Sequence, residues 1–97
     1  MTVFERELYQ RTSEVLHYVW DPIGVAHEPA ARDEYDSYLP IVVSMLRDPC
    51  RHTAIAAALL QIERDRMGLA PDAQRADMVM AVLVDWMIIL MEKYRDA

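Results

Sequence analysis

The longest apolar stretch of the chain runs from Met78 to Met91 and is interrupted by one charged residue, Asp85. As an α-helix it would be about 21 Å long, too short for the roughly 20 apolar residues that span a bilayer. We therefore predict a mostly buried C-terminal helix against which the rest of the chain packs. At about 100° per residue, Asp85 shares a narrow stripe with Gln74, Ala81 and Glu92, so we expect its carboxylate to face solvent.

The N-terminal segment has apolar residues at the three- and four-residue spacing of a buried helical face. We predict a helix that begins at Thr2, which has the spacing of a capping box with Glu5, and that ends near Trp20. Its expected core face consists of Phe4, Leu8, Val15 and Val19 and is widened by Tyr9, Leu16 and Trp20. The sequence of residues 21–24, with Asp first, Pro second and Gly fourth, then suits a type I turn.

Two more helices are predicted between this turn and the apolar stretch. One runs from Pro29 to Leu46 and should be kinked or broken near Pro40, which cannot donate a helical hydrogen bond. The other ends at Gly68, which is placed to adopt a left-handed capping conformation, and Asp72 marks the start of the last helix. All 97 residues should thus form one all-α domain, a small four-helix bundle with a kinked second helix.

The charge of the chain limits its partners. The formal net charge is −6, and an acidic surface repels nucleic acid and anionic membranes but attracts basic proteins. The single cysteine, Cys50, excludes an internal disulfide, and the first residues do not have the pattern of a signal peptide. We therefore expect a cytoplasmic protein without nucleic-acid or membrane partners.

Candidate chemistry is sparse. His17, Asp21, His27 and Glu28 are residue types that hold metals, and they support an alternative in which the chain is a small metal-binding protein or enzyme. Cys50 and His52 are two residues apart and would diverge on a helix. The sequence contains no glycine-rich phosphate loop and no nucleophile motif, so we expect neither catalysis nor a cofactor.

One segment concentrates acidic and tyrosine residues. Its candidate partner-binding residues are Glu28, Asp33, Glu34, Tyr35, Asp36 and Tyr38. They are consistent with a solvated helix whose tyrosines reach the core. They are equally consistent with a recognition surface, because tyrosine supplies contact area with a polar tip and carboxylates steer a basic partner.

Three short motifs carry a resemblance to a group of known sequences. WDPIGV at residues 20–25, DEYDSYLP at residues 33–40 and IERDRMGL at residues 62–69 resemble, in this order, a pattern in small uncharacterised bacterial helical proteins. The resemblance implies an all-helical bundle and no particular activity. Within the third motif, Glu63 and Arg66 have the spacing of an intrahelical ion pair. In size, acidity and helical layout alone, the chain is also similar to bacterial immunity proteins, which neutralise toxins.

These observations favour a non-catalytic acidic protein-binding module, in its narrowest form an immunity protein that blocks a basic toxin. A third alternative is a homo-oligomeric structural module, because four short helices cannot hide a hydrophobic content of 54%. We expect a homodimer whose interface lies along the last helix. Its expected contact residues are Met78, Ile88, Ile89 and Met91.

Overall fold

The computed structural model describes residues 1–96, and these form four α-helices and no strand. The helices are α1 (Val3–Val15), α2 (Leu39–Leu46), α3 (Ile55–Asp65) and α4 (Ala73–Lys93). Shorter helical turns are the π-helix η1 (Leu16–Trp20) and the 3₁₀ helices η2 (Pro29–Ala31), η3 (Asp36–Tyr38) and η4 (Pro49–Ala54). The predicted all-α four-helix bundle is confirmed. None of the helices in this part of the chain combines the length and apolar character that a membrane crossing needs.

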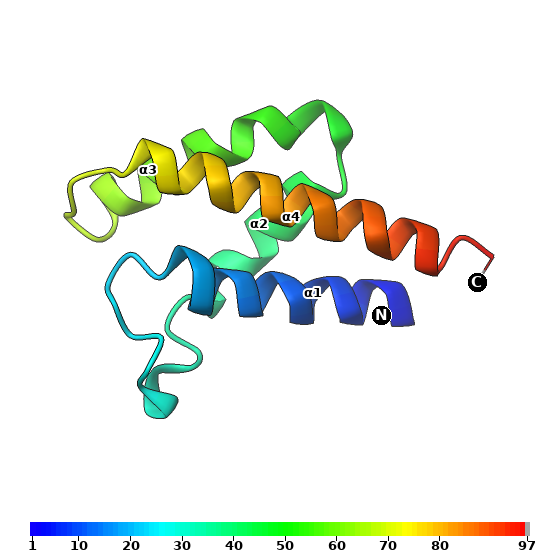
Figure 1. The fold of residues 1–97 in the computed structure, drawn as a ribbon, viewed down its shortest axis with the longest axis horizontal. Coiled ribbons are helices and arrows are strands. Elements are labelled where there is room, and N and C mark those ends of the chain that lie inside the picture. The colour runs from blue at the N-terminus through cyan, green and yellow to red at the C-terminus, as the bar shows by residue number, and fades with distance from the viewer. Residues whose placement is uncertain (97) are drawn as a thin grey trace.

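The helices form two layers. In the view of Figure 1, α4 lies in the front layer and α2 lies in the layer behind it. Figure 1 shows α4 between α1 on one side and α3 with η4 on the other, while α2 passes behind it. α4 accordingly packs mainly against α1 and α3. The core is mainly aliphatic, and its fully buried members include Leu8, Leu16, Leu46, Leu59 and Leu83.

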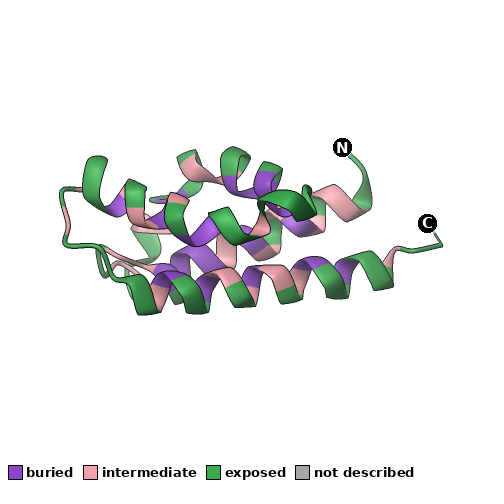
Figure 2. Ribbon diagram, turned by 90° about the horizontal axis from the view of Figure 1, so that it is seen from above, coloured by how far each residue is buried: buried purple, intermediate pink, exposed green. Residues whose placement is uncertain are grey.

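α4 buries one face, so the prediction of a mostly buried C-terminal helix is wrong. Its buried residues are Ala76, Val79, Leu83, Met87 and Leu90, which recur every three or four positions. The three shorter helices cover that face only, and the opposite face remains open to solvent (Figure 2). Asp85 lies on the open face, as predicted.

α1 begins as predicted and ends in an unexpected way. The Thr2 hydroxyl accepts a hydrogen bond from the Glu5 backbone N–H at 3.1 Å. In η1 the Asp21 N–H donates to the Leu16 carbonyl at 3.0 Å, a bond that spans five residues rather than four. This wider turn shifts the helical register, so Trp20 is buried and Val19 is 36% exposed. The predicted core position of Val19 is therefore wrong.

The predicted break near Pro40 is confirmed, but the predicted helix upstream of it, over residues 29–38, is wrong. Residues 29–38 contain two 3₁₀ turns, and α2 begins only at Leu39. Pro40 has no N–H to donate to the Asp36 carbonyl, so an α-helix cannot continue upstream through that bond. In the first turn of α2 the same residue is tolerated, because the N–H groups there have no helical partner.

The connection from α3 to α4 follows the predicted signals and adds a buried ion pair. Gly68 adopts the left-handed conformation (φ 65°), and the Asp72 carboxylate caps α4 by accepting from the Arg75 N–H at 3.0 Å. Glu63 is completely buried and pairs with Arg75 at 2.5 Å across this connection, while the Asp72 N–H donates to its other oxygen at 3.3 Å. The predicted intrahelical pair with Arg66 is therefore wrong.

Candidate protein-binding surface

The chain leaves the bundle between the π-turn and α2 in a segment of 18 residues, 21–38, which we call the acidic loop. Figure 1 shows it projecting from the end of the bundle where α1 ends. Its only regular structure is the two 3₁₀ turns η2 and η3. Connections longer than about 15 residues are uncommon in compact domains, and they are usually either functional or disordered.

Asp21 organises the start of this loop. It has a left-handed backbone (φ 34°), which ends the π-turn and reverses the chain. One carboxylate oxygen accepts from the N–H groups of Gly24 at 3.1 Å and Val25 at 2.7 Å, and the other accepts from that of Ala26 at 3.0 Å. The Gly24 N–H also bonds the Asp21 carbonyl at 3.2 Å, which closes the predicted turn.

Tyr35 connects the far part of the loop to Asp21. Its hydroxyl donates to the Asp21 carboxylate at 2.7 Å and accepts from the Ile23 N–H at 3.1 Å. Its ring packs against Trp20, with ring centroids 5.3 Å apart, and only 2% of the residue is exposed. Tyr35 therefore anchors the loop and cannot contact a partner, so its assignment as a partner-binding residue is wrong. Tyr38 is half-buried, edge-on to the same indole.

The electrostatics of this anchor keep it in one protonation state near neutral pH. Burial acts to raise the pKa of Asp21, but hydrogen bonds from Tyr35 and from three backbone N–H groups hold it below its usual value. Burial, followed by the hydrogen bond to the Asp21 carboxylate, raises the pKa of Tyr35 well above its usual value. Asp21 is thus charged and Tyr35 is protonated at physiological pH, which preserves the hydrogen bond between them.

A second anchor ties the loop to α1. The Arg32 guanidinium donates to the Ser13 hydroxyl at 2.9 Å and lies over the Tyr18 ring, 5.5 Å from its centroid. The same hydroxyl donates to the Asp36 carboxylate at 3.3 Å. Because Arg32 is the only basic side chain among residues 28–38 and is turned toward α1, the outer surface of the loop is left to the carboxylates.

The four acidic residues named from the sequence all lie exposed on this loop. They are Glu28, Asp33, Glu34 and Asp36. Asp36 is held by Ser13, whereas Glu28, Asp33 and Glu34 form no side-chain hydrogen bond or ion pair within residues 1–96. The structure thus places the four acidic members of the predicted binding set on one exposed loop and removes Tyr35 from the set.

The residues of the metal alternative do not converge. His17 is buried in the π-turn, and both Asp21 oxygens already accept hydrogen bonds. His27 and Glu28 are exposed farther along the loop. No group of three or more residues that could hold a metal exists in the described chain. Cys50 is exposed in η4, whereas the His52 ring nitrogen lies 2.6 Å from the Leu46 carbonyl.

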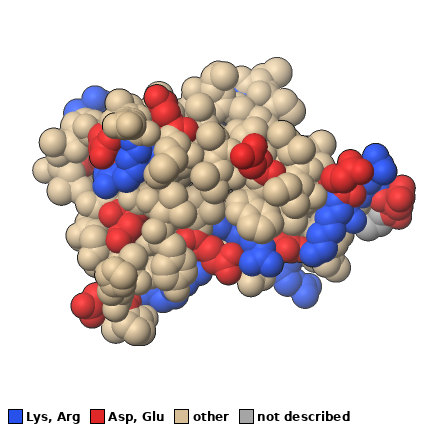
Figure 3. All heavy atoms as spheres, viewed as in Figure 1, with Lys and Arg blue, Asp and Glu red and all other residues tan. Residues whose placement is uncertain are grey.

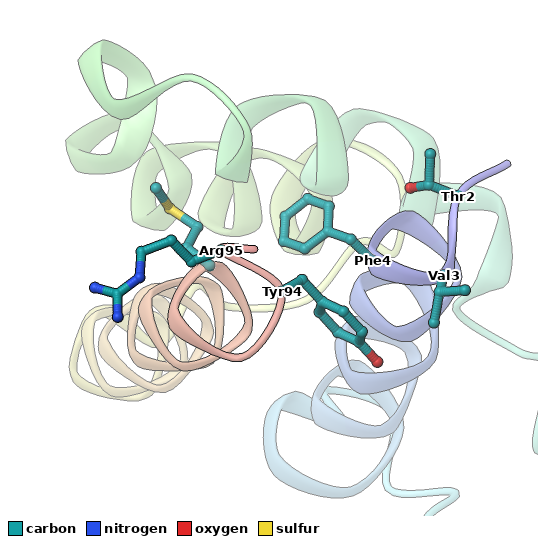
Figure 4. A pocket seen from close by; sticks show the side chains of 6 residues that line it. Thr2, Val3, Phe4, Tyr94 and Arg95 are labelled. Atoms are coloured by element: carbon teal, nitrogen blue, oxygen red, sulfur yellow. The ribbon is translucent and has the colours of Figure 1, made fainter. Parts of the chain in front are cut away.

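A hollow of about 530 Å³ lies at the other end of the molecule, where the start of α1 meets the end of α4. Its lining residues are Thr2, Val3, Phe4, Met91, Tyr94 and Arg95, and Figure 4 shows the Phe4 and Tyr94 rings edge to face between the two helices. Arg95 is paired with Glu92 at 3.1 Å. These walls are mainly apolar and place no nucleophile beside a general base.

Two features of this arrangement escaped the sequence patterns. Residues Glu63 and Arg75 are twelve positions apart, so no helical spacing connects them. The hydrogen bond of Tyr35 to Asp21 spans fourteen positions, and the only sequence signal near it is the turn that starts at Asp21.

Comparisons of the chain with protein-family models, curated proteins and solved structures return no match.

Proposed function

We propose that this protein is a non-catalytic binding module that recognises a basic protein through the exposed carboxylates of the acidic loop. The observation that supports it most directly is the presentation of Glu28, Asp33 and Glu34 on an anchored loop, where none of the three carboxylates has a side-chain hydrogen bond or ion pair within residues 1–96. Lysine and arginine side chains are the groups that such a surface attracts, both in steering the encounter and in charge-assisted hydrogen bonds.

The anchors of the loop support binding rather than chance exposure. Asp21, Tyr35 and Arg32 tie the loop to itself and to α1 before any partner arrives. A surface that is already ordered loses little conformational entropy on association, so more of the contact energy appears as affinity. An unanchored loop of 18 residues would have to be ordered by the partner.

The side chains of the loop fit binding better than proton transfer. The Asp21 carboxylate is occupied by four hydrogen bonds, and the Tyr35 hydroxyl is buried between Asp21 and Ile23. The remaining acidic groups are open to water and are not paired with a nucleophile. Catalysis is therefore not part of the proposal.

The narrower form of the proposal is a bacterial immunity protein that neutralises a basic toxin in the cytoplasm. The net charge of −6, the small helical bundle and the free acidic surface support it. It predicts that the captured partner, expressed alone, arrests bacterial growth and that co-expression of this chain restores growth. Rescue by an equally abundant variant with a reversed loop charge would contradict it.

The broader proposal is tested by capture from an extract of the native host at low salt. The bait is the intact chain, compared with Asp33→Lys/Glu34→Lys in the loop. Glu92→Lys/Asp96→Lys, at the opposite end of the molecule (Figure 1), is the matched control with the same net charge. We expect the intact chain and the control to retain one basic protein in near-stoichiometric amount and the loop variant to lose it. Equal retention by all three baits would contradict the proposed surface.

A further inference from the structure

We propose that the open face of α4 binds a second copy of this chain in an antiparallel dimer with twofold symmetry. The α4 face consists of Gln74, Asp77, Met78, Ala81, Asp85, Ile88, Ile89 and Glu92. This face is separate from the acidic loop, so the dimer and the binding of a basic partner can be tested independently.

The first argument is the apolar character of this face. Met78, Ile88 and Ile89 are between 49% and 59% exposed on a helix whose other side is fully packed. Met91, 54% exposed, extends the apolar surface toward the hollow of Figure 4. Figure 3 shows that most atoms over the middle of α4 are uncharged. Several large apolar side chains exposed on one helix face are more typical of an interface than of a free surface.

The second argument is the shape of the molecule. Its extents are 43 × 31 × 18 Å, and α4 runs along one of the two broad faces (Figures 1 and 2). The outline of that face exceeds the roughly 800 Å² that each partner contributes to a standard interface. The 21 residues of α4 form a ridge about 31 Å long across it.

The spacing of the apolar residues indicates an antiparallel register. Met78 and Ile88 stand five positions before and after Leu83. If a twofold axis passes at the level of Leu83, Met78 of one copy lies level with Ile88 of the other, on both sides of the axis. A symmetric pair of apolar contacts about 15 Å apart results.

The charges of the face agree with this register. The other residues that come level are Asp77 with Ile89, Ala81 with Asp85, and Gln74 with Glu92. No carboxylate on the face then lies opposite another. If the axis lay at Ala81, Asp77 of one copy would be level with Asp85 of the other. If the axis lay at Asp85, the Asp85 carboxylates of the two copies would be level with each other. A parallel pair would also place each carboxylate beside its own copy, which is unfavourable.

The surface beside the axis has room for side chains of a second copy. A hollow of about 350 Å³ separates η4 from the middle of α4. Its lining residues are His52, Thr53, Met80, Ala81, Val84 and Asp85. The small side chain of Ala81 lets another helix approach closely at this level.

Sedimentation equilibrium at micromolar concentration tests the dimer. We expect twice the mass of the chain, and we expect Met78→Glu or Ile88→Glu to raise the dissociation constant at least about tenfold, as for a central interface residue. Ile41→Glu is the matched control, because Ile41 is 52% exposed on α2 in the other layer. A monomeric native chain, or a dimer that resists both α4 variants, overturns the proposal. A monomer whose α4 face is covered only when a basic protein is added assigns the face to that protein instead.

Cross-linking tests the register in a chain whose own cysteine is removed by Cys50→Ser. Oxidation of a mixture of Met78→Cys and Ile88→Cys chains should give the mixed dimer, and each variant alone should give little. Efficient cross-linking of either variant with itself, with no preference for the mixed product, contradicts the antiparallel register. The circular dichroism melting curve of each variant confirms that it is folded.

Discussion

The Tyr35 hydroxyl donates a 2.7 Å hydrogen bond to the Asp21 carboxylate, which also accepts from three backbone N–H groups. Tyr35 stands just before the 3₁₀ turn that leads into α2, and Asp21 stands at the end of the π-turn. The bond therefore closes the acidic loop at its base. The exposed carboxylates between these two residues owe their fixed position to it.

Tyr35→Phe should destabilise the protein by about 1–3 kcal/mol, because it leaves the Ile23 N–H and part of the Asp21 carboxylate without a partner. Urea denaturation at pH 7 measures the loss. The control is Tyr18→Phe, because Tyr18 is 58% exposed and its ring contacts are kept. If both variants are as stable as the native chain, the hydroxyl of Tyr35 does not anchor the loop.

Arg75→Met should cost about 3–5 kcal/mol, because it leaves the buried Glu63 carboxylate without its cation. Glu63→Gln should cost less, since the amide keeps a group that can bond Arg75 and the Asp72 N–H. Arg95→Met removes an exposed pair and should change stability by less than about 0.5 kcal/mol. Chemical denaturation of the three variants ranks these costs, and equal values for Arg75 and Arg95 would contradict the buried pair.

Gly68→Val should lower the free energy of unfolding by about 1 kcal/mol or more, because a β-branched residue tolerates a left-handed backbone poorly. A Cβ at this position would meet no atom within 4 Å, so the cost comes from the backbone alone. Gly68→Asn should be milder, since asparagine adopts this conformation more readily. A melting temperature unchanged by valine would show that α3 does not need this cap.

Acid should weaken the contact between α1 and the end of α4. Hydrogen bonds from Lys93 and Tyr94 lower the pKa of Glu7 to about 2. A carboxylate with a depressed folded-state pKa contributes stability above its unfolded value, and that contribution is lost as the pH falls from about 4.5 to about 2. Urea midpoints measured across this range should fall less steeply for Glu7→Gln than for the native chain. The slope should be unchanged in Glu34→Gln, and an unchanged slope in both variants would contradict the role of Glu7.

Local signals predicted the parts of the fold that depend on neighbouring residues. The caps at Thr2, Gly68 and Asp72 each act within a few positions, and all three are confirmed. The solvent-facing position of Asp85 follows from helical geometry alone. The exposure of the acidic loop residues could also be predicted, because aspartate and glutamate are rarely buried without a partner.

The errors arose where contacts distant in the sequence decide the structure. The π-turn moved Val19 out of the core, and no spacing rule reveals such a turn. The sequence left open whether Tyr35 reaches the core or a partner, because Asp21, to which it bonds, lies fourteen positions away. The extent of burial of α4 depends on how much of it three short helices can cover, which is a property of the assembled bundle.

The dissociation constant of the captured basic protein tests the central claim most directly. It should be measured by calorimetry at several salt concentrations for the native chain, for Asp33→Lys/Glu34→Lys and for Glu92→Lys/Asp96→Lys. We predict that the loop variant binds at least about 100-fold more weakly, as expected for two reversed charges at an interface, and that the native affinity falls as salt rises. An equal affinity for the two charge-matched variants, or one that does not change with salt, would contradict recognition by the acidic loop.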